Sequence, residues 1–228
     1  MSTLNPQSRD IVLGRIRRAL GAKDDDVERR VAVQRRLHAP AAGPLPARTQ
    51  GSRQELVQQL KMRLEALSAS AEVAAVADIP ARVADFLKRN NLPARVRSGG
   101  DPLLAGLDWS KAPSVTVEHG RAQPSDEVSL THAVAAAAET GTLVLVSGTD
   151  NPTTLSFLPE TEIIVVRAED VEGSYEATWS RIRALYGDRT MPRSVNWVSG
   201  PSRTGDIDQT LVLGAHGPRR LHVVIAEG

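Results

Sequence analysis

The chain of 228 residues contains no cysteine. This absence excludes disulfide bonds, zinc sites with thiolate ligands, cysteine nucleophiles and iron–sulfur clusters held by cysteines of this chain. Aromatic residues are scarce as well, at 3% of the sequence. Their scarcity disfavours binding of single-stranded nucleic acid, which relies on base stacking, and it leaves the core to aliphatic side chains.

Long apolar runs and the common ligand motifs are also missing. No segment approaches the roughly 20 apolar residues that span a bilayer, and the first residues lack the apolar segment of a signal peptide. Neither of the two glycine-rich phosphate fingerprints occurs. The five histidines are scattered, so we expect no metal site: His38, His119, His132, His216 and His222. We therefore expect a soluble, cytoplasmic protein without a membrane span.

Charge divides the chain into two parts. Residues 1–53 contain 11 Lys and Arg against five Asp and Glu, whereas residues 54–228 contain 17 against 22. A nucleic-acid-binding protein would be expected to have a basic body, and this body is mildly acidic. The basic N-terminal part is expected to attract acidic surfaces.

The basic part reads as a helical arm followed by a linker. Amphipathic patterns predict helices over 8–20 and 24–37, and the Pro-rich stretch 39–46 interrupts any regular element. We therefore predict an arm with its linker over residues 1–50 and a separate domain over residues 51–228.

The predicted domain alternates helices with short aliphatic strands. Unbroken runs such as 143–146 and 163–166 are typical of strands buried on both faces of a sheet. The pattern predicts an α/β fold with an open, mostly parallel sheet flanked by helices. The expected strands are 73–77, 94–96, 114–117, 128–130, 142–146, 162–166, 194–198 and 221–225. The expected helices are 52–68, 80–90, 131–138, 155–158, 174–186 and 206–213.

Ligands of open α/β sheets bind at the carboxyl ends of the strands. Two polar loops follow expected strands there, and each is either a simple turn or part of a ligand site. The first begins with Ser147 and Gly148. The second holds four candidate ligand-binding residues: Gly200, Ser202, Arg203 and Thr204.

Acidic residues follow the second loop. Asp206 and Asp208 would occupy the first turn of the expected helix 206–213, where they stabilise the helix dipole and repel a bound anion. Asp206 is therefore either a helix stabiliser or a polar contact for a ligand or partner, and it is one candidate catalytic residue.

Glu139 and His216 are the other candidate catalytic residues. Glu139 would end the expected helix 131–138, an unfavourable place for a negative charge. Its carboxylate either accepts hydrogen bonds from a neighbouring loop or acts as a base or nucleophile. His216 stands in a sharp turn before the last strand, where a histidine is either solvated or catalytic.

Four motifs together resemble the lactate-utilisation protein C family, whose members carry the LUD domain. They are Ala138-Glu-Thr-Gly-Thr142, Leu158-Pro159, Gly200-Pro-Ser-Arg-Thr-Gly-Asp-Ile207 and Gly214-Ala-His-Gly-Pro218. The departures are small, because Gly205, Asp208 and Ala215 stand where the family pattern suggests Ala, Glu and Val. The resemblance adds Thr140, Gly141 and Thr142 to the candidate ligand-binding residues.

The resemblance implies a fold similar to sugar-phosphate isomerases and coenzyme A transferases. It also implies a bacterial three-protein system that oxidises L-lactate to pyruvate, in which the other two proteins contain iron–sulfur clusters. Without cysteines, this chain is expected to be an accessory or substrate-handling subunit with no cofactor of its own, docked to its partners through the arm. Two alternatives stay open: an independent coenzyme A transferase-like or isomerase-like enzyme that uses Glu139, and a sensor of small carboxylates.

Overall fold

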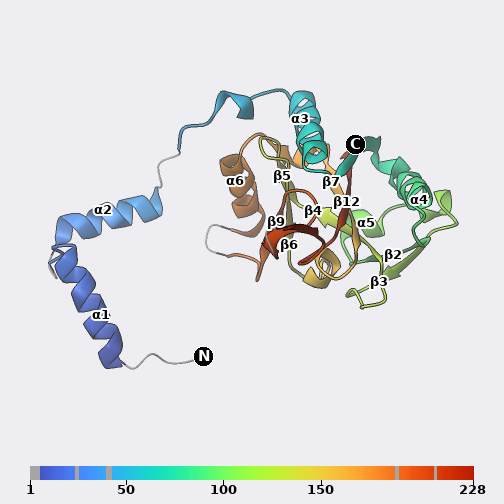
Figure 1. Cartoon of the computed structure of the whole chain (residues 1–228). Helices are drawn as coiled ribbons and strands as arrows, with labels where there is room; N and C mark the ends of the chain where they lie inside the picture. The colour runs from blue at the N-terminus through green and yellow to red at the C-terminus, as the bar shows by residue number, and fades with distance from the viewer. Residues whose placement is uncertain (1–5, 24–25, 40–42, 188–189, 208–209) are drawn as a thin grey trace. The chain divides into compact units, whose positions relative to one another are not determined.

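The computed structural model describes residues 6–23, 26–39, 43–187, 190–207 and 210–228, with the side chains of residues 6–7, 205–207 and 210–211 left out. The chain forms two units, residues 1–44 and residues 45–228 (Figure 1). The first unit holds the two expected helices, α1 (Pro6–Ala19) and α2 (Val27–His38). The α2 helix begins where the Asp26 carboxylate accepts a hydrogen bond from the Arg29 backbone at 2.9 Å. All of its side chains are exposed, including the apolar Val31 and Leu37.

The second unit is built on a six-stranded sheet in which every neighbouring pair is parallel. This arrangement confirms the predicted α/β class. The strand order is β1, β12, β7, β4, β2, β3. Their bounds are β1 Ser70–Ala75, β12 Arg220–Glu227, β7 Thr161–Arg167, β4 Val128–Ala133, β2 Arg95–Ser98 and β3 Thr116–His119.

A second sheet of four strands lies against the first, which the sequence did not indicate. Its order is β8, β5, β6, β9, and the β5–β6 and β6–β9 pairs are antiparallel. A separate hairpin pairs β10 with β11. The bounds are β8 Val171–Glu172, β5 Ala135–Ala137, β6 Thr142–Val146, β9 Val195–Val198, β10 Arg203–Ile207 and β11 Thr210–Leu213.

Helices cover the outer faces of the two sheets (Figure 1). The α4 helix (Ile79–Arg89) and the short α5 (Pro102–Ala105) pack on one face of the six-stranded sheet through an aliphatic cluster. The α3 helix (Arg53–Ala66) shares the opposite face with the four-stranded sheet, and α6 (Tyr175–Tyr186) covers the outer face of the latter. The 3-10 turns are Ala47–Thr49, Val76–Asp78, Trp109–Lys111, Thr153–Ser156 and Ala168–Asp170.

The prediction of a helix over 131–138 is wrong. This stretch supplies the end of β4 and all of β5, so one run of chain enters both sheets and changes from one to the other at Val134. Alanine favours helices, but here β4 pairs with β7 and β2, and β5 pairs with β6 and β8. Ala135 to Ala138 are fully buried between packed layers, where larger side chains would not fit.

The expected helix over 206–213 is wrong as well, because the chain forms the β10–β11 hairpin there. The backbones of 203–204 and 212–213 pair in register there, so the segment is a strand and not a helix. The segment expected as a helix over 155–158 is instead the 3-10 turn Thr153–Ser156. None of the helices in the described ranges combines the length and apolarity needed to cross a bilayer.

Candidate functional site

Two of the four motifs, 200–207 and 214–218, contribute to the lining of a cavity of about 220 Å³. One wall is the turn 199–202 that follows β9, and another is formed by residues 216–218, just before β12. Trp197 and the end of the 3-10 turn Thr153–Ser156 complete the lining, together with Glu162 and Leu221. We take this cavity as the candidate site and call it the Glu162 cavity.

Ser202 holds the two turns together. Its backbone N–H donates to the Pro218 carbonyl at 2.8 Å, and its carbonyl accepts from the Gly214 N–H at 2.9 Å. The Ser202 hydroxyl also accepts a hydrogen bond from the backbone of His216 at 3.3 Å. His216 and Ser202 thus line one cavity, although they are 14 positions apart in the sequence.

The turn 199–202 depends on Gly200. This residue has φ +81°, and an added Cβ would lie 2.8 Å from the Leu67 carbonyl oxygen at the end of α3. A left-handed backbone against another backbone oxygen tolerates no side chain. The close approach to α3 therefore fixes the wall of the cavity.

Glu162 is the most unusual residue of the cavity. It is the second residue of β7, it is 1% exposed, and its Oε1 accepts a hydrogen bond from the Thr131 hydroxyl at 2.9 Å. Burial raises the pKa of Glu162 to about 7, although hydrogen bonds from Thr131 and Ser156 act in the opposite direction. Among the described residues, no cation forms an ion pair with this carboxyl group.

This carboxyl group gives the cavity its chemistry. Near neutral pH Glu162 exists in both protonation states, so it is able to donate or accept a proton at the same position. In its neutral form it has a hydrogen to donate and adds no negative charge to the cavity. His216 and Ser202 supply further polar groups to the same space.

The sequence analysis missed Glu162. One signal was present, since the residue is a single acid directly before the apolar run 163–166. The structure shows that its strand is buried throughout except for its last residue. The site also lies at the amino ends of β7 and β12 rather than at the carboxyl ends that the sequence indicated, because Glu162 and Leu221 are each second in their strands and pair in register.

A row of hydroxyl groups adjoins the cavity. The Thr142 Oγ1 lies 2.6 Å from the Ser199 hydroxyl, 2.9 Å from the Tyr175 hydroxyl and 2.8 Å from the Thr140 hydroxyl. Ser199 lines the cavity itself, so this network connects the predicted residues Thr140 and Thr142 with the candidate site. Gly141 lies in the turn between β5 and β6, against α3.

Glu139 lies outside this cavity. One carboxylate oxygen accepts a hydrogen bond from the Tyr175 backbone at 3.1 Å, and the other accepts from the Arg48 guanidinium at 3.2 Å. Tyr175 is the first residue of α6, so the carboxylate faces the positive end of a helix dipole. Because Glu139 follows a strand, the expected unfavourable position at the end of a helix is wrong.

The remaining residues of the second predicted loop point elsewhere. The Arg203 guanidinium donates to the Leu67 carbonyl, and Thr204 is buried in β10. Asp206 lies in β10, so it does not begin a helix; its side chain and the whole of Asp208 lie outside the described residues.

The first predicted loop lies at the other end of the four-stranded sheet. Since β6 and β9 are antiparallel, Val146 pairs with Val195, far from Val198. The Ser147 hydroxyl accepts a hydrogen bond from the Ser194 backbone at 2.8 Å, and both Ser147 and Gly148 line a separate hollow of about 590 Å³. The two predicted loops are therefore not brought together. Among the described residues, no group of three His, Asp or Glu is placed to hold a metal ion.

Comparisons with known proteins match this chain to the LUD domain, over residues 57–226. A protein named Lactate utilization protein C from Deinococcus radiodurans is 30% identical over 189 residues, which cover 81% of this chain and 86% of that protein. A protein of the same name from Halalkalibacterium halodurans is 34% identical over 103 residues, or 44% of each chain. The crystal structure of a DUF162 family protein from Deinococcus radiodurans has the same fold, with a TM-score of 0.57, 23% identity, and coverage of 78% of this chain and 100% of that one.

Proposed function

Because the chain belongs to the LUD domain family, we propose that it takes part in bacterial lactate use, the process for which its relatives are named. In this proposal it is an accessory or substrate-handling subunit of a system that oxidises L-lactate to pyruvate. The Glu162 cavity binds the small acid that enters or leaves the reaction.

One observation carries the proposal: a fully buried carboxyl group with a pKa raised to about 7 lines a small cavity. A volume of about 220 Å³ is below the range of about 300–1,000 Å³ that is typical of sites for drug-sized ligands. It suits an acid of a few heavy atoms. The ligand carboxylate accepts a hydrogen bond from neutral Glu162, and its 2-oxygen meets the polar groups of Ser202 and His216.

The electrons of the oxidation have to leave through other proteins. A chain without cysteine has no ligands for an iron–sulfur cluster of the common type. We therefore propose that the clusters belong to partner proteins and that the basic unit 1–44 docks on an acidic surface of one of them. The exposed apolar side chains of α1 and α2, such as Ile11 and Val31, would become buried in that contact.

Ligand binding to the full-length protein tests the first part. We expect L-lactate or pyruvate at millimolar concentration to raise the thermal unfolding temperature at pH 6. Propionate, which lacks the 2-oxygen, serves as the control ligand and should have a smaller effect. Binding should weaken at pH 8, where Glu162 is ionised and repels the ligand carboxylate.

Two variants locate the binding. Gly217→Ala adds a methyl group inside the cavity, where the nearest heavy atom is 3.5 Å from the new Cβ, so the fold is expected to persist while binding is lost. Glu162→Gln keeps a hydrogen-bond donor but should remove the pH dependence. If neither acid shifts the unfolding temperature of the wild-type protein, the substrate-handling role is contradicted.

A deletion strain tests the cellular role. Loss of the gene should impair growth on L-lactate but not on glucose, and removal of residues 1–44 should abolish co-purification with the iron–sulfur partners while ligand binding persists. Normal growth of the deletion strain on lactate would rule the role out.

A second candidate function uses Glu139 as the nucleophile of a coenzyme A transferase-like reaction. The observation in its favour is that this carboxylate is nearly buried, with 9% side-chain exposure. Nucleophilic attack would require its release from Arg48 and from the Tyr175 backbone. A thioester trapped at Glu139 would support this function, and unchanged activity of Glu139→Gln would exclude it.

A further inference from the structure

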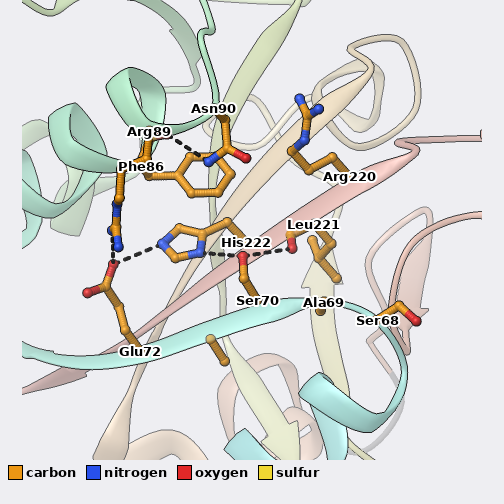
Figure 2. Close-up of a pocket in the computed structure, with 11 residues that line it drawn as sticks. Ser68, Ala69, Ser70, Glu72, Phe86, Arg89, Asn90, Arg220, Leu221 and His222 are labelled. Carbon is orange, nitrogen blue, oxygen red and sulfur yellow. Dashed lines mark hydrogen bonds and ion pairs between the residues drawn. The ribbon is translucent and has the colours of Figure 1, made fainter.

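A second cavity, of about 440 Å³, opens on the other face of the six-stranded sheet at the amino ends of β1 and β12 (Figure 2). The proposed lactate role makes no use of it. Its lining includes three side chains that form a chain of hydrogen bonds, with His222 between Ser70 and Glu72. We call it the His222 cavity.

The strand register brings these three residues together. Ser70 and Glu72 lie two positions apart on β1 and therefore point to the same face of the sheet. His222 of β12 is the direct register partner of Ser70. His222 Nδ1 lies 2.8 Å from the Ser70 hydroxyl, and its Nε2 lies 3.1 Å from Glu72 Oε1.

The imidazole is held rigidly between its partners. His222 is 3% exposed and stacks on the Phe86 ring, with centroids 4.1 Å apart and planes at 9° (Figure 2). Glu72 lies within ion-pair distance of Arg82, at 3.8 Å, and of Arg89, at 4.0 Å. A carboxylate beside Nε2 favours the tautomer with the hydrogen on that nitrogen, and in this tautomer the lone pair of Nδ1 faces the Ser70 hydroxyl.

This arrangement leaves His222 able to take a proton. Burial lowers the pKa of His222, and the attraction of Glu72 offsets part of that effect. The imidazole is therefore neutral at pH 7. In the tautomer with its hydrogen on Nε2 it accepts the Ser70 hydrogen bond at 2.8 Å, a shorter contact than the 3.5 Å from the same hydroxyl to the Leu221 carbonyl. Once protonated, it would be stabilised by the Glu72 carboxylate. Ser70 itself is exposed and faces the cavity.

We propose that Ser70 is a nucleophile, with His222 as its general base and Glu72 as the residue that positions the imidazole. A serine, a base within hydrogen-bond reach and a third group that orients the base are the components of nucleophilic acyl transfer. The substrate class is a small ester or thioester that carries a carboxylate. Arg89, at 4.0 Å from Glu72, and Arg220, which donates a hydrogen bond to Thr161, both line the cavity, and each has further guanidinium hydrogens for the substrate carboxylate.

The reaction balances without a cofactor. The Ser70 oxygen bonds to the acyl carbon while its proton passes to His222 Nδ1. The bond from the acyl carbon to the leaving oxygen or sulfur then breaks, and the leaving group takes that proton. Water, deprotonated by the same imidazole, attacks the acyl-serine, so that the carboxylic acid is released and Ser70 regains its hydrogen.

Covalent labelling of the full-length protein tests the proposal. A fluorophosphonate probe should label Ser70, as located by peptide mass spectrometry, and mono-p-nitrophenyl succinate should be hydrolysed faster than p-nitrophenyl acetate. Ser70→Ala should abolish labelling and lower hydrolysis by at least about 100-fold, the usual contribution of such a group. Ser68→Ala is the matched control, because Ser68 lines the same cavity but has no hydrogen bond to His222 among the described contacts.

The positioning role of Glu72 has its own readout. Glu72→Gln keeps the shape of the side chain, so we expect slower labelling of Ser70 with an unchanged circular dichroism spectrum and an unchanged KM. Equal labelling of wild-type protein and Ser70→Ala would overturn the proposal, and so would a folded wild-type protein that is not labelled at Ser70. Neither result depends on lactate binding at Glu162.

Discussion

The Glu162 cavity and the His222 cavity lie on opposite faces of the six-stranded sheet, near the amino ends of β7 and β12, and Leu221 lines both. Each contains one buried ionisable side chain near the amino end of a strand. Glu162 has only hydroxyl groups as partners, whereas His222 has both a hydroxyl and a carboxylate. The difference lies in whether a counter-charge accompanies the buried group.

Burial acts on both side chains by the same physical cause, because the charged form loses its hydration. For the acid this raises the pKa, and for the base it lowers the pKa. Glu162 is thereby suited to hold or release a proton near pH 7, as acid binding requires. His222 is suited to accept a proton from its neighbour and to keep it close to Glu72.

The largest effect on stability is expected when the side chain of Leu221, which lines both cavities, is shortened. Leu221 is 2% exposed, so Leu221→Ala should lower the free energy of unfolding by about 2–5 kcal/mol. Urea denaturation measures it. Leu158→Ala, at a position that is 51% exposed, is the control and should cost far less. A loss below about 1 kcal/mol for Leu221→Ala would show that the cavities are not separated by a packed wall.

The second prediction concerns the pH dependence that Glu162 causes. Between its ordinary pKa of 4.5 and its raised pKa of about 7, the folded protein keeps a proton that the unfolded chain has lost. The free energy of unfolding therefore falls as pH rises through this window, by about 3 kcal/mol in total. Glu162→Gln should remove that fall. Parallel profiles for the two proteins in urea titrations from pH 4 to 8 would contradict the raised pKa.

The third prediction concerns the glycine that shapes the Glu162 cavity. Gly200→Ala should lower the free energy of unfolding by about 1–3 kcal/mol, because φ +81° strains a side chain and the new Cβ meets the Leu67 carbonyl. It should also weaken lactate binding without affecting labelling of Ser70. Gly217→Ala is the matched glycine control for stability, and its unfolding should be nearly unchanged. Equal stability losses in both variants would argue against the described turn.

The smallest effect should come from His222, and it has the opposite sign. Below its ordinary pKa of 6.5, the unfolded chain binds a proton that the folded protein does not, so stability falls as pH falls. Glu72 reduces this effect, while Arg89 adds to it. His222→Gln should flatten the profile between pH 5 and 6.5, as measured by urea denaturation. A steeper profile in the variant would contradict the lowered pKa of His222.

Much of the architecture was predictable from local patterns. Unbroken aliphatic runs indicated the strands of the parallel sheet, β6 was placed at 142–146 with its observed bounds, and the four motifs indicated the family that the comparisons confirm. These features depend on neighbouring residues, which the sequence displays directly. The boundary predicted near residue 50 stays a prediction, and the structure groups residues 45–50 with the second unit.

The features that were missed depend on contacts between distant segments. The alanine run 135–138 has a helix-forming composition, and only its pairing with β6 and β8 makes it a strand. The same holds for the sites. Burial under the surrounding layers raises the pKa of Glu162 against the opposite effect of the Thr131 and Ser156 hydrogen bonds. His222 meets Ser70, 152 positions away in the chain, through the register of β12 with β1.

The passage of one strand from the first sheet into the second at Val134 has a mechanical consequence. Thr131, which holds the Glu162 carboxyl group, and Glu139, which holds the first turn of α6, stand on the same short length of nearly inextensible chain. The two sheets therefore cannot slide past one another unless this stretch of chain loses its strand pairing in one of them.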